Sequence, residues 1–81
     1  MTFKTLECVV LTRDVVEHGL RAGDQGAIVD LCEPDGLEVE FVTADGHTQA
    51  LLTLRADDVR KAEPGEIVTV RPTRAAAHRP A

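Results

Sequence analysis

The chain has 81 residues, 43% of them hydrophobic and 28% charged, and its 9 basic and 14 acidic side chains give a net charge of −5. This is the size of one domain and the composition of a globular protein, which excludes a second domain and a disordered chain. No apolar run approaches the roughly 18–20 residues of a membrane span, and no small-residue cleavage site of a secretory signal follows the N-terminus. We therefore expect a cytoplasmic protein in which Cys8 and Cys32 are reduced; a disulfide that joins the first two strands is the alternative if these strands pair side by side.

Short apolar runs alternate with turns along residues 1–63. The runs cover residues 8–11, 27–31, 37–42 and 47–54, and the turns between the last three contain Asp35-Gly36 and Asp45-Gly46. Asp-Gly between alternating runs is typical of a β-hairpin. Residues 56–59 have the composition of a helical turn before a short last strand. We predict an all-β fold, a small SH3-like barrel of four to five antiparallel strands with a long loop at residues 12–22; an OB-like barrel is the alternative.

The second apolar run does not alternate strictly, because a period of two cannot place both Ile28 and Leu31 inside. A β-bulge or a sharp bend would let both side chains point inward, and a small barrel needs bent strands to close on itself. The predicted core consists of Val9, Leu11, Leu20, Ile28, Leu31, Val39, Phe41, Leu52, Leu54 and Val59.

Charge and composition both change near residues 62–65. Residues 1–63 carry 6 basic and 13 acidic side chains, a net charge of −7, whereas residues 64–81 contain three of the four prolines and a net charge of +2. We predict a barrel domain at residues 1–63 and a Pro/Arg/Ala-rich tail at residues 64–81 that is mobile over 72–81. The alternation of residues 66–70 suits an edge strand on this barrel or on a second copy, so a homo-oligomer through this segment is a further prediction.

The third run places Glu38 and Glu40 on its outward face and Leu37, Val39 and Phe41 on its inward face. Paired carboxylates perform acid–base catalysis where burial separates their pKa values, and an outward strand face leaves them in solvent. The sequence has no phosphate-binding loop, no Ser-His-Asp pattern and no cluster of metal ligands. We predict a protein that is not an enzyme and that holds no cofactor and no metal.

Several binding modes of small barrels require aromatic side chains, and the chain has only Phe3 and Phe41. Proline-rich peptides, methyl-lysine and single-stranded nucleic acid all bind on aromatic surfaces. A body with a net charge of −7 also repels phosphate, so nucleic acid is not expected to bind the barrel. The remaining modes are docking by opposite charge and strand addition. We predict that the partner is a basic protein and not a membrane, contacted by Asp14, Glu17, Glu38 and Glu40.

Several short segments occur in a fixed order along residues 5–62: Leu11-x-x-Asp14, Gly19-Leu20, Gly23-Asp24-x-Gly26, Val39-Glu40-Phe41, Asp45-Gly46 and Leu52-Thr53-Leu54. In this order they resemble an uncharacterised bacterial family, the domain of unknown function 4926 (DUF4926). The family has no established activity that the resemblance could imply for this chain. Its members are said to lie near toxin-like genes, so the resemblance implies an immunity or antitoxin role. Gly23-x-x-Gly26 before alternating apolar residues is also similar to the KOW motif of ribosomal and transcription-elongation proteins, although a tight turn accounts for such glycines without it.

These observations predict a small protein-interaction module, resembling an immunity protein or antitoxin, that docks an acidic face on a basic partner. The alternatives are a KOW-like accessory protein of the ribosome or the transcription machinery, with the basic tail as its RNA contact, and a small subunit of a larger enzyme complex. The acidic body favours the interaction module over the RNA-associated protein.

Overall fold

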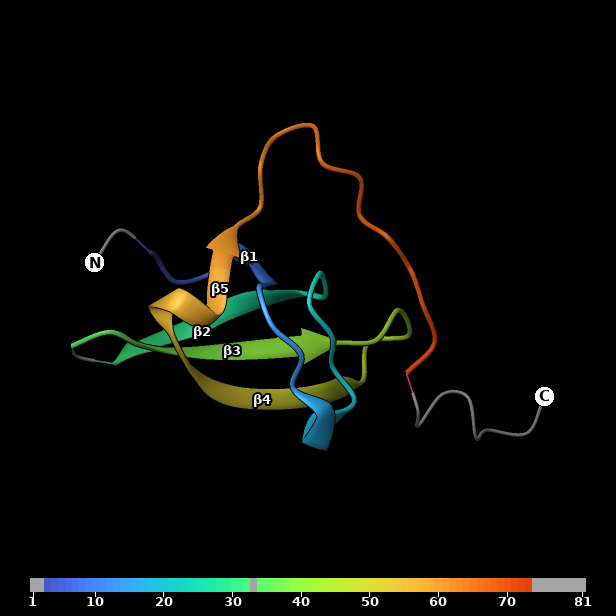
Figure 1. Cartoon of the computed structure of the whole chain (residues 1–81), viewed down its shortest axis with the longest axis horizontal. Helices are drawn as coiled ribbons and strands as arrows, with labels where there is room; N and C mark the ends of the chain where they lie inside the picture. The colour runs from blue at the N-terminus through green and yellow to red at the C-terminus, as the bar shows by residue number, and fades with distance from the viewer. Residues whose placement is uncertain (1–2, 33, 74–81) are drawn as a thin grey trace.

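In the part of the chain that the structure describes, five antiparallel strands form one sheet in the order β4-β3-β2-β1-β5 (Figure 1). The computed structural model describes residues 3–32 and 34–73. The strands are β1 (Cys8–Leu11), β2 (Gln25–Cys32), β3 (Gly36–Val42), β4 (Thr48–Arg55) and β5 (Val59–Lys61), with the 3-10 turns η1 (Val16–His18) after β1 and η2 (Ala56–Asp58) before β5. A four-strand meander whose first strand also pairs with the fifth is the topology of a small SH3-like barrel, so the predicted fold class is confirmed.

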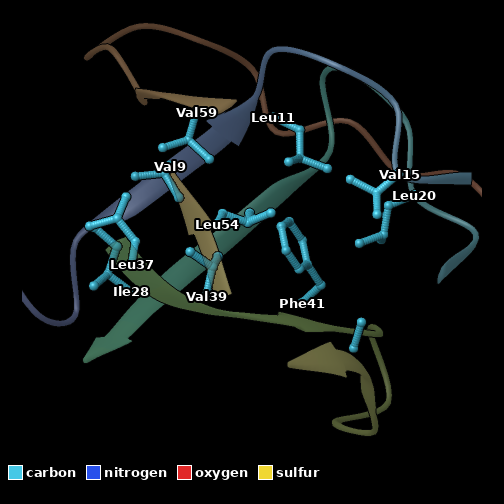
Figure 2. Packing of buried hydrophobic residues seen from close by; sticks show 11 residues of the cluster. Val9, Leu11, Val15, Leu20, Ile28, Leu37, Val39, Phe41, Leu54 and Val59 are labelled. Atoms are coloured by element: carbon cyan, nitrogen blue, oxygen red, sulfur yellow. The ribbon is translucent and has the colours of Figure 1, made fainter. Parts of the chain in front are cut away.

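Every strand contributes side chains to the core around which the sheet curls (Figure 2). The core consists of Val9, Leu11, Val15, Leu20, Ile28, Leu37, Val39, Phe41, Ala50, Leu54 and Val59. The alternation of side chains along a β-strand is clearest in β3, where every second residue, Leu37, Val39 and Phe41, is at most 2% exposed. Eight of the ten predicted core residues are buried, and Leu52 is half-buried and packs against the others.

The irregularity in β2 is a β-bulge, as the sequence predicted. The pairing of β2 with β3 shifts register between Ile28 and Asp30, and Ile28 is fully buried. The prediction that Leu31 joins the core is wrong, because its residue surface remains 39% exposed. Leu31 lies opposite Leu37, but β1 pairs with β2 only as far as Ala27, so less of the chain covers this end of β2.

The long loop between β1 and β2 folds back on itself and closes one end of the barrel. Val15 and Leu20 form an isolated β-bridge around η1, and Gly19 takes the left-handed backbone conformation with a φ of +70° at the end of this turn. Val15 is 4% exposed and Leu20 3%, and both side chains point toward Phe41 (Figure 2). The loop is therefore part of the core and positions the acidic residues that it carries.

The two glycines of the Gly23-x-x-Gly26 segment have different structural roles. Gly23 occupies a turn with a φ of +96°, which glycine adopts without strain. Gly26 lies in β2, where a Cβ atom would be 2.7 Å from Val39 Cγ1 and 2.8 Å from Phe41 Cε1. A turn and a close approach to the core thus account for both glycines, and the similarity to a KOW motif is not needed to explain them.

The chain after β5 leaves the sheet and arches beside it (Figure 1). Residues 66–70 form no strand with any described part of this chain, so their predicted pairing with the barrel's own edge is wrong, and their pairing with a second copy stays a prediction. Glu66 pairs with Arg60 of the edge strand β5, and Arg71 pairs with Asp24 in the turn before β2, so side-chain ion pairs and not a backbone ladder join the segment to the barrel. Of the predicted mobile segment 72–81, residues 74–81 lie outside the described residues. Cys8 is exposed and Cys32 is half-buried, and no disulfide joins them in this structure; that both are reduced in the native protein stays a prediction.

Candidate functional site

The acidic side chains of β3 project from the outer face of the sheet, which is the face opposite the core. Glu38 accepts a hydrogen bond from the Thr53 hydroxyl, and Glu40 accepts one of 2.6 Å from the Thr48 hydroxyl, both on β4. Asp30 of β2 is the pairing partner of Glu38, and paired residues of antiparallel strands project from the same face. We call Asp30, Glu38 and Glu40 the acidic face. Glu38 and Glu40 are both half-buried, and each carboxylate is held by a hydroxyl of the neighbouring strand.

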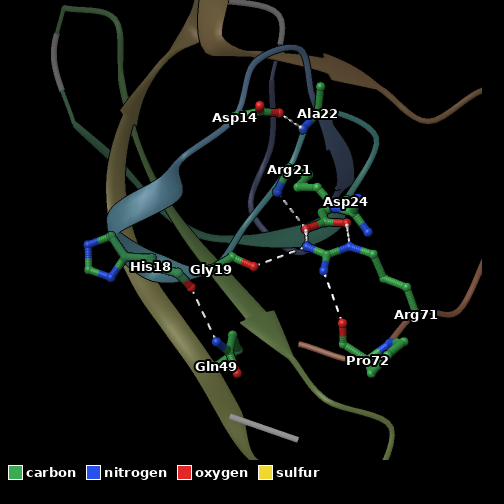
Figure 3. A network of polar contacts seen from close by, with 9 residues as sticks. All are labelled: Asp14, His18, Gly19, Arg21, Ala22, Asp24, Gln49, Arg71 and Pro72. Atoms are coloured by element: carbon green, nitrogen blue, oxygen red, sulfur yellow. Dashed lines mark hydrogen bonds and ion pairs between the residues drawn. The ribbon is translucent and has the colours of Figure 1, made fainter. Parts of the chain in front are cut away.

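Asp14 and Glu17 lie on the loop that closes the barrel and do not belong to the acidic face. Asp14 Oδ1 accepts a hydrogen bond of 2.9 Å from the Ala22 amide, which fastens the two sides of the loop (Figure 3). Glu17 is exposed in η1. No hydrogen bond or ion pair within residues 3–32 and 34–73 connects either of them with Glu38 or Glu40. The structure therefore divides the four predicted residues into a strand pair and a loop pair.

Asp30 is a member of the acidic face that sequence reasoning missed. The predicted bulge turns Ile28 and Leu31 to the same face and therefore turns Asp30 outward, but the sequence analysis did not extend this consequence to Asp30. Two exposed apolar residues follow Glu40 along β3 or lie opposite it on β4: Val42 is 51% exposed and Leu51 56%. Leu51 is the pairing partner of Glu40, so the acidic face is a mixed surface of charge and apolar area.

The segment after β5 is an extended strap, defined here as residues 66–70, and its first anchor is an ion pair at Glu66. Arg60 of β5 donates two hydrogen bonds to the Glu66 carboxylate, 2.8 Å from Nη1 and 2.7 Å from Nη2. The Glu63 amide donates a third, and the Glu66 amide returns a bond of 3.1 Å to the Glu63 carbonyl. Pro64 and Gly65, with a φ of +91° at Gly65, form the turn between them. The anchor thus fixes the direction in which the strap leaves the barrel.

The second anchor joins the other end of the strap to the turn before β2 (Figure 3). Arg71 makes a bidentate ion pair with Asp24, with Nε 2.9 Å from Oδ1, and its Nη2 also donates to the Gly19 carbonyl at 3.1 Å. Asp24 in turn accepts a hydrogen bond of 2.8 Å from the Arg21 amide. The two side chains of the pair are only 25% and 19% exposed. No sequence pattern indicated this contact, because its partners are 47 residues apart.

Both anchor carboxylates remain charged across the physiological range. The hydrogen bonds from Arg60 and from the Glu63 amide lower the pKa of Glu66 to about 2. Burial raises the pKa of Asp24, but the hydrogen bonds from Arg71 and the Arg21 amide outweigh that effect, so this pKa lies below its ordinary value. The strap is therefore fastened at both ends at neutral pH.

A groove of about 1230 Å³ lies between the strap and the outer face of the sheet, and we call it the outer groove. Its lining includes the outward-facing residues Cys8, Val10, Ala27 and Glu40 of the first three strands, and it continues over the turn before β2 and the hairpin that joins β3 to β4. Its roof is the strap itself, whose apolar side chains are largely in solvent, with Ile67 87%, Val68 67% and Val70 85% exposed. The outer groove and the acidic face share Glu40, so the two form one continuous surface.

The described residues offer little for other kinds of chemistry. Within residues 3–32 and 34–73, no three His, Cys, Asp or Glu side chains gather in a way that could hold a metal ion. None of the helical turns in that part of the chain has the length or the apolar character of a membrane span. Phe41 is buried in the core, and Phe3 packs against the core beneath the Lys61 ammonium, which lies 5.7 Å from its ring centroid.

Comparison with known proteins places the barrel in a family. No curated protein and no solved structure is detectably similar to the chain. Residues 5–61 match a family described as a domain of unknown function, DUF4926, and this range begins before β1 and ends at the last residue of β5. The strap lies outside the matched range. The match covers the whole barrel and more than half of the sequence, and the chain therefore belongs to the DUF4926 family.

Proposed function

We propose that this protein is a small interaction module of the cytoplasm, resembling an immunity protein or antitoxin, that docks its acidic face on a basic protein. It acts by binding and has no catalytic activity of its own. The observation that carries the proposal is the acidic face, on which Asp30, Glu38 and Glu40 project together from the same side of the sheet. Such a surface speeds association with a cationic protein and covers a cationic site once it is bound.

The charge of the whole barrel supports the same partner chemistry. Residues 1–63 carry 6 basic and 13 acidic side chains, and this net charge of −7 repels the phosphates of nucleic acid. The burial of Phe41 and the packing of Phe3 leave no aromatic platform for bases or proline-rich peptides. The apolar residues beside the carboxylates, Val42 and Leu51, supply area that a protein partner can bury.

The KOW-like alternative depends on a basic tail that contacts RNA, and one arginine of that tail is already engaged. Arg71 pairs with Asp24 through a bidentate contact that is three-quarters buried on the arginine side. Its charge is therefore neutralised within the protein, which weakens any phosphate contact by the tail. A small subunit of a larger enzyme complex would use the same acidic face, and it differs from an immunity protein only in the identity of the partner.

A pull-down from the source cell with matched charge variants tests the proposal. Glu38→Lys with Glu40→Lys reverses two charges of the acidic face, and Asp35→Lys with Asp57→Lys makes the same change in net charge elsewhere. Asp35 and Asp57 make only exposed contacts of 3.6 and 3.9 Å with Arg55, so the control keeps the fold.

We expect the wild type and the control to retain the same basic protein and the Glu38/Glu40 variant to lose it. Equal retention by all three proteins, or an RNA as the retained partner, would contradict the proposed function.

A further inference from the structure

We propose that the outer groove binds an extended basic segment of a partner protein, which adds to the strap as a β-strand. This inference rests on the proposed function, because it names the part of the basic partner that this protein recognises. It also gives the strap a role in binding, whereas docking through the acidic face alone does not involve the strap.

The strap has the unpaired backbone groups that strand addition requires. Residues 66–70 run between two anchors outside any helix, strand or turn, and no hydrogen bond reaches the backbone of Ile67, Val68, Thr69 or Val70 from any described residue. An incoming strand pairs with such unpaired N–H and C=O groups. Because the anchors at Glu66 and Arg71 already hold the strap in place, little conformational entropy is lost when a strand pairs with it.

The size of the outer groove indicates a peptide segment and not a small molecule. Its volume of about 1230 Å³ exceeds the roughly 300–1,000 Å³ of small-molecule sites. The apolar side chains of Ile67, Val68 and Val70 are exposed above it, and Val10 and Ala27 lie on its floor. A segment in the outer groove would contact apolar surface from both sides.

The charge of the lining indicates a basic segment. Among the described residues, the outer groove is lined by five acidic side chains, Asp24, Glu40, Asp45, Glu63 and Glu66, and by the two arginines Arg60 and Arg71. Both arginines are engaged in bidentate pairs with Glu66 and Asp24, so neither is free to bind an acidic ligand. The excess negative charge also disfavours a second copy of this chain, whose residues 1–63 carry the same net charge of −7.

The test uses the full chain and a short synthetic peptide of alternating lysine and valine, with a peptide of alternating glutamate and valine as its control. Alternate residues of an extended strand direct their N–H groups to opposite edges. Ile67→Pro with Thr69→Pro therefore removes donors from one edge of the strap, and Val68→Pro with Val70→Pro removes donors from the other. These side chains are exposed and their amides are unpaired, so both variants keep the fold.

We expect the lysine peptide to bind and the glutamate peptide not to bind. One proline pair should weaken binding at least about tenfold, by removing two backbone hydrogen bonds, and the other should leave it nearly unchanged. Bound peptide should also slow alkylation of Cys8, which lies on the groove floor, relative to Cys32, which does not line the groove.

Equal effects of the two proline pairs, or unprotected Cys8 in the presence of bound peptide, would overturn the inference. So would a concentration-dependent dimer of the chain alone that both protects Cys8 and excludes the peptide, because a second copy would then be the occupant. If the natural partner is lost on reversal of Glu38 and Glu40 but is indifferent to both proline pairs, the proposed function stands and the groove inference fails. If the natural partner is retained both by the Glu38/Glu40 variant and by the proline variants, the proposed function and the groove inference are both wrong.

Discussion

Gly26 in β2 has no room for a side chain, and replacing it tests how tightly the barrel is packed. In Gly26→Ala the new Cβ would lie 2.7 Å from Val39 Cγ1, 2.8 Å from Phe41 Cε1 and 3.0 Å from the carbonyl oxygen of Glu40. The first two distances are shorter than the roughly 3.5–4.0 Å of an ordinary carbon contact. Val39 is fully buried and Phe41 is 2% exposed, so neither can move into solvent.

Two effects of opposite sign determine the stability of Gly26→Ala. Overpacking a core costs about 1–3 kcal/mol, and restricting the unfolded chain at a former glycine returns about 0.4–1 kcal/mol. The steric effect is larger, so the free energy of unfolding should fall by about 1–2 kcal/mol. For a domain of this size the corresponding loss in Tm is about 4–16 °C.

Urea denaturation followed by circular dichroism measures this loss, because the chain has no tryptophan or tyrosine to report by fluorescence. Val39→Ala serves as the second arm of a double-mutant cycle, since it removes the Cγ1 atom that the new Cβ would meet. The double variant should be more stable than the sum of the two single effects predicts. A Gly26→Ala protein as stable as the wild type, or strict additivity with Val39→Ala, would refute the packing argument.

Three further predictions concern the core, the strap and the thiols. Val39→Asp should abolish cooperative urea unfolding, because an unpaired buried charge costs several kcal/mol against a total stability of the same order. The pKa values of Asp24 and Glu66 are lowered from 3.8 and 4.5, so the stabilisation by the anchors is fully present above those values and is lost as the pH falls through the folded ones, toward about 2 for Glu66. In an NMR titration the amide signals of the strap should stay constant above pH 5, and a change between pH 5 and 7 would contradict this assignment. Thiol titration of the unfolded, unreduced protein should find both Cys8 and Cys32, and finding neither would mean that a disulfide forms.

The barrel could be predicted from the sequence because its strands are specified locally. In β3 the strict alternation of Leu37, Val39 and Phe41 with Glu38 and Glu40 fixes both the strand and its two faces. The hairpin turns carry Asp-Gly, which is a local signal as well. The bulge in β2 was also predictable, because the apolar pattern itself breaks there.

Features that depend on contacts between distant segments could not be predicted in the same way. The exposure of Leu31 depends on how far β1 extends along β2, and the outward position of Asp30 depends on the exact place of the bulge. The pair between Asp24 and Arg71 joins residues 47 apart and has no local signature. The alternation of residues 66–70 wrongly predicted pairing with the barrel's own edge, because ion pairs from Glu66 to Arg60 and from Arg71 to Asp24, and not backbone hydrogen bonds, join this segment to the barrel.

If the acidic face steers a basic protein onto the barrel, the association rate with that protein depends on the charge of this face. Association of the pulled-down partner should be followed by stopped flow at low and high salt for the wild type, the Glu38→Lys/Glu40→Lys variant and the Asp35→Lys/Asp57→Lys control. We expect the wild-type association rate to fall with salt, because charges are screened beyond about 8–10 Å at physiological ionic strength. We also expect the Glu38/Glu40 variant to lose more in association rate than it gains in dissociation rate, while the control stays close to the wild type. Identical association rates for all three proteins at low salt would contradict the claim.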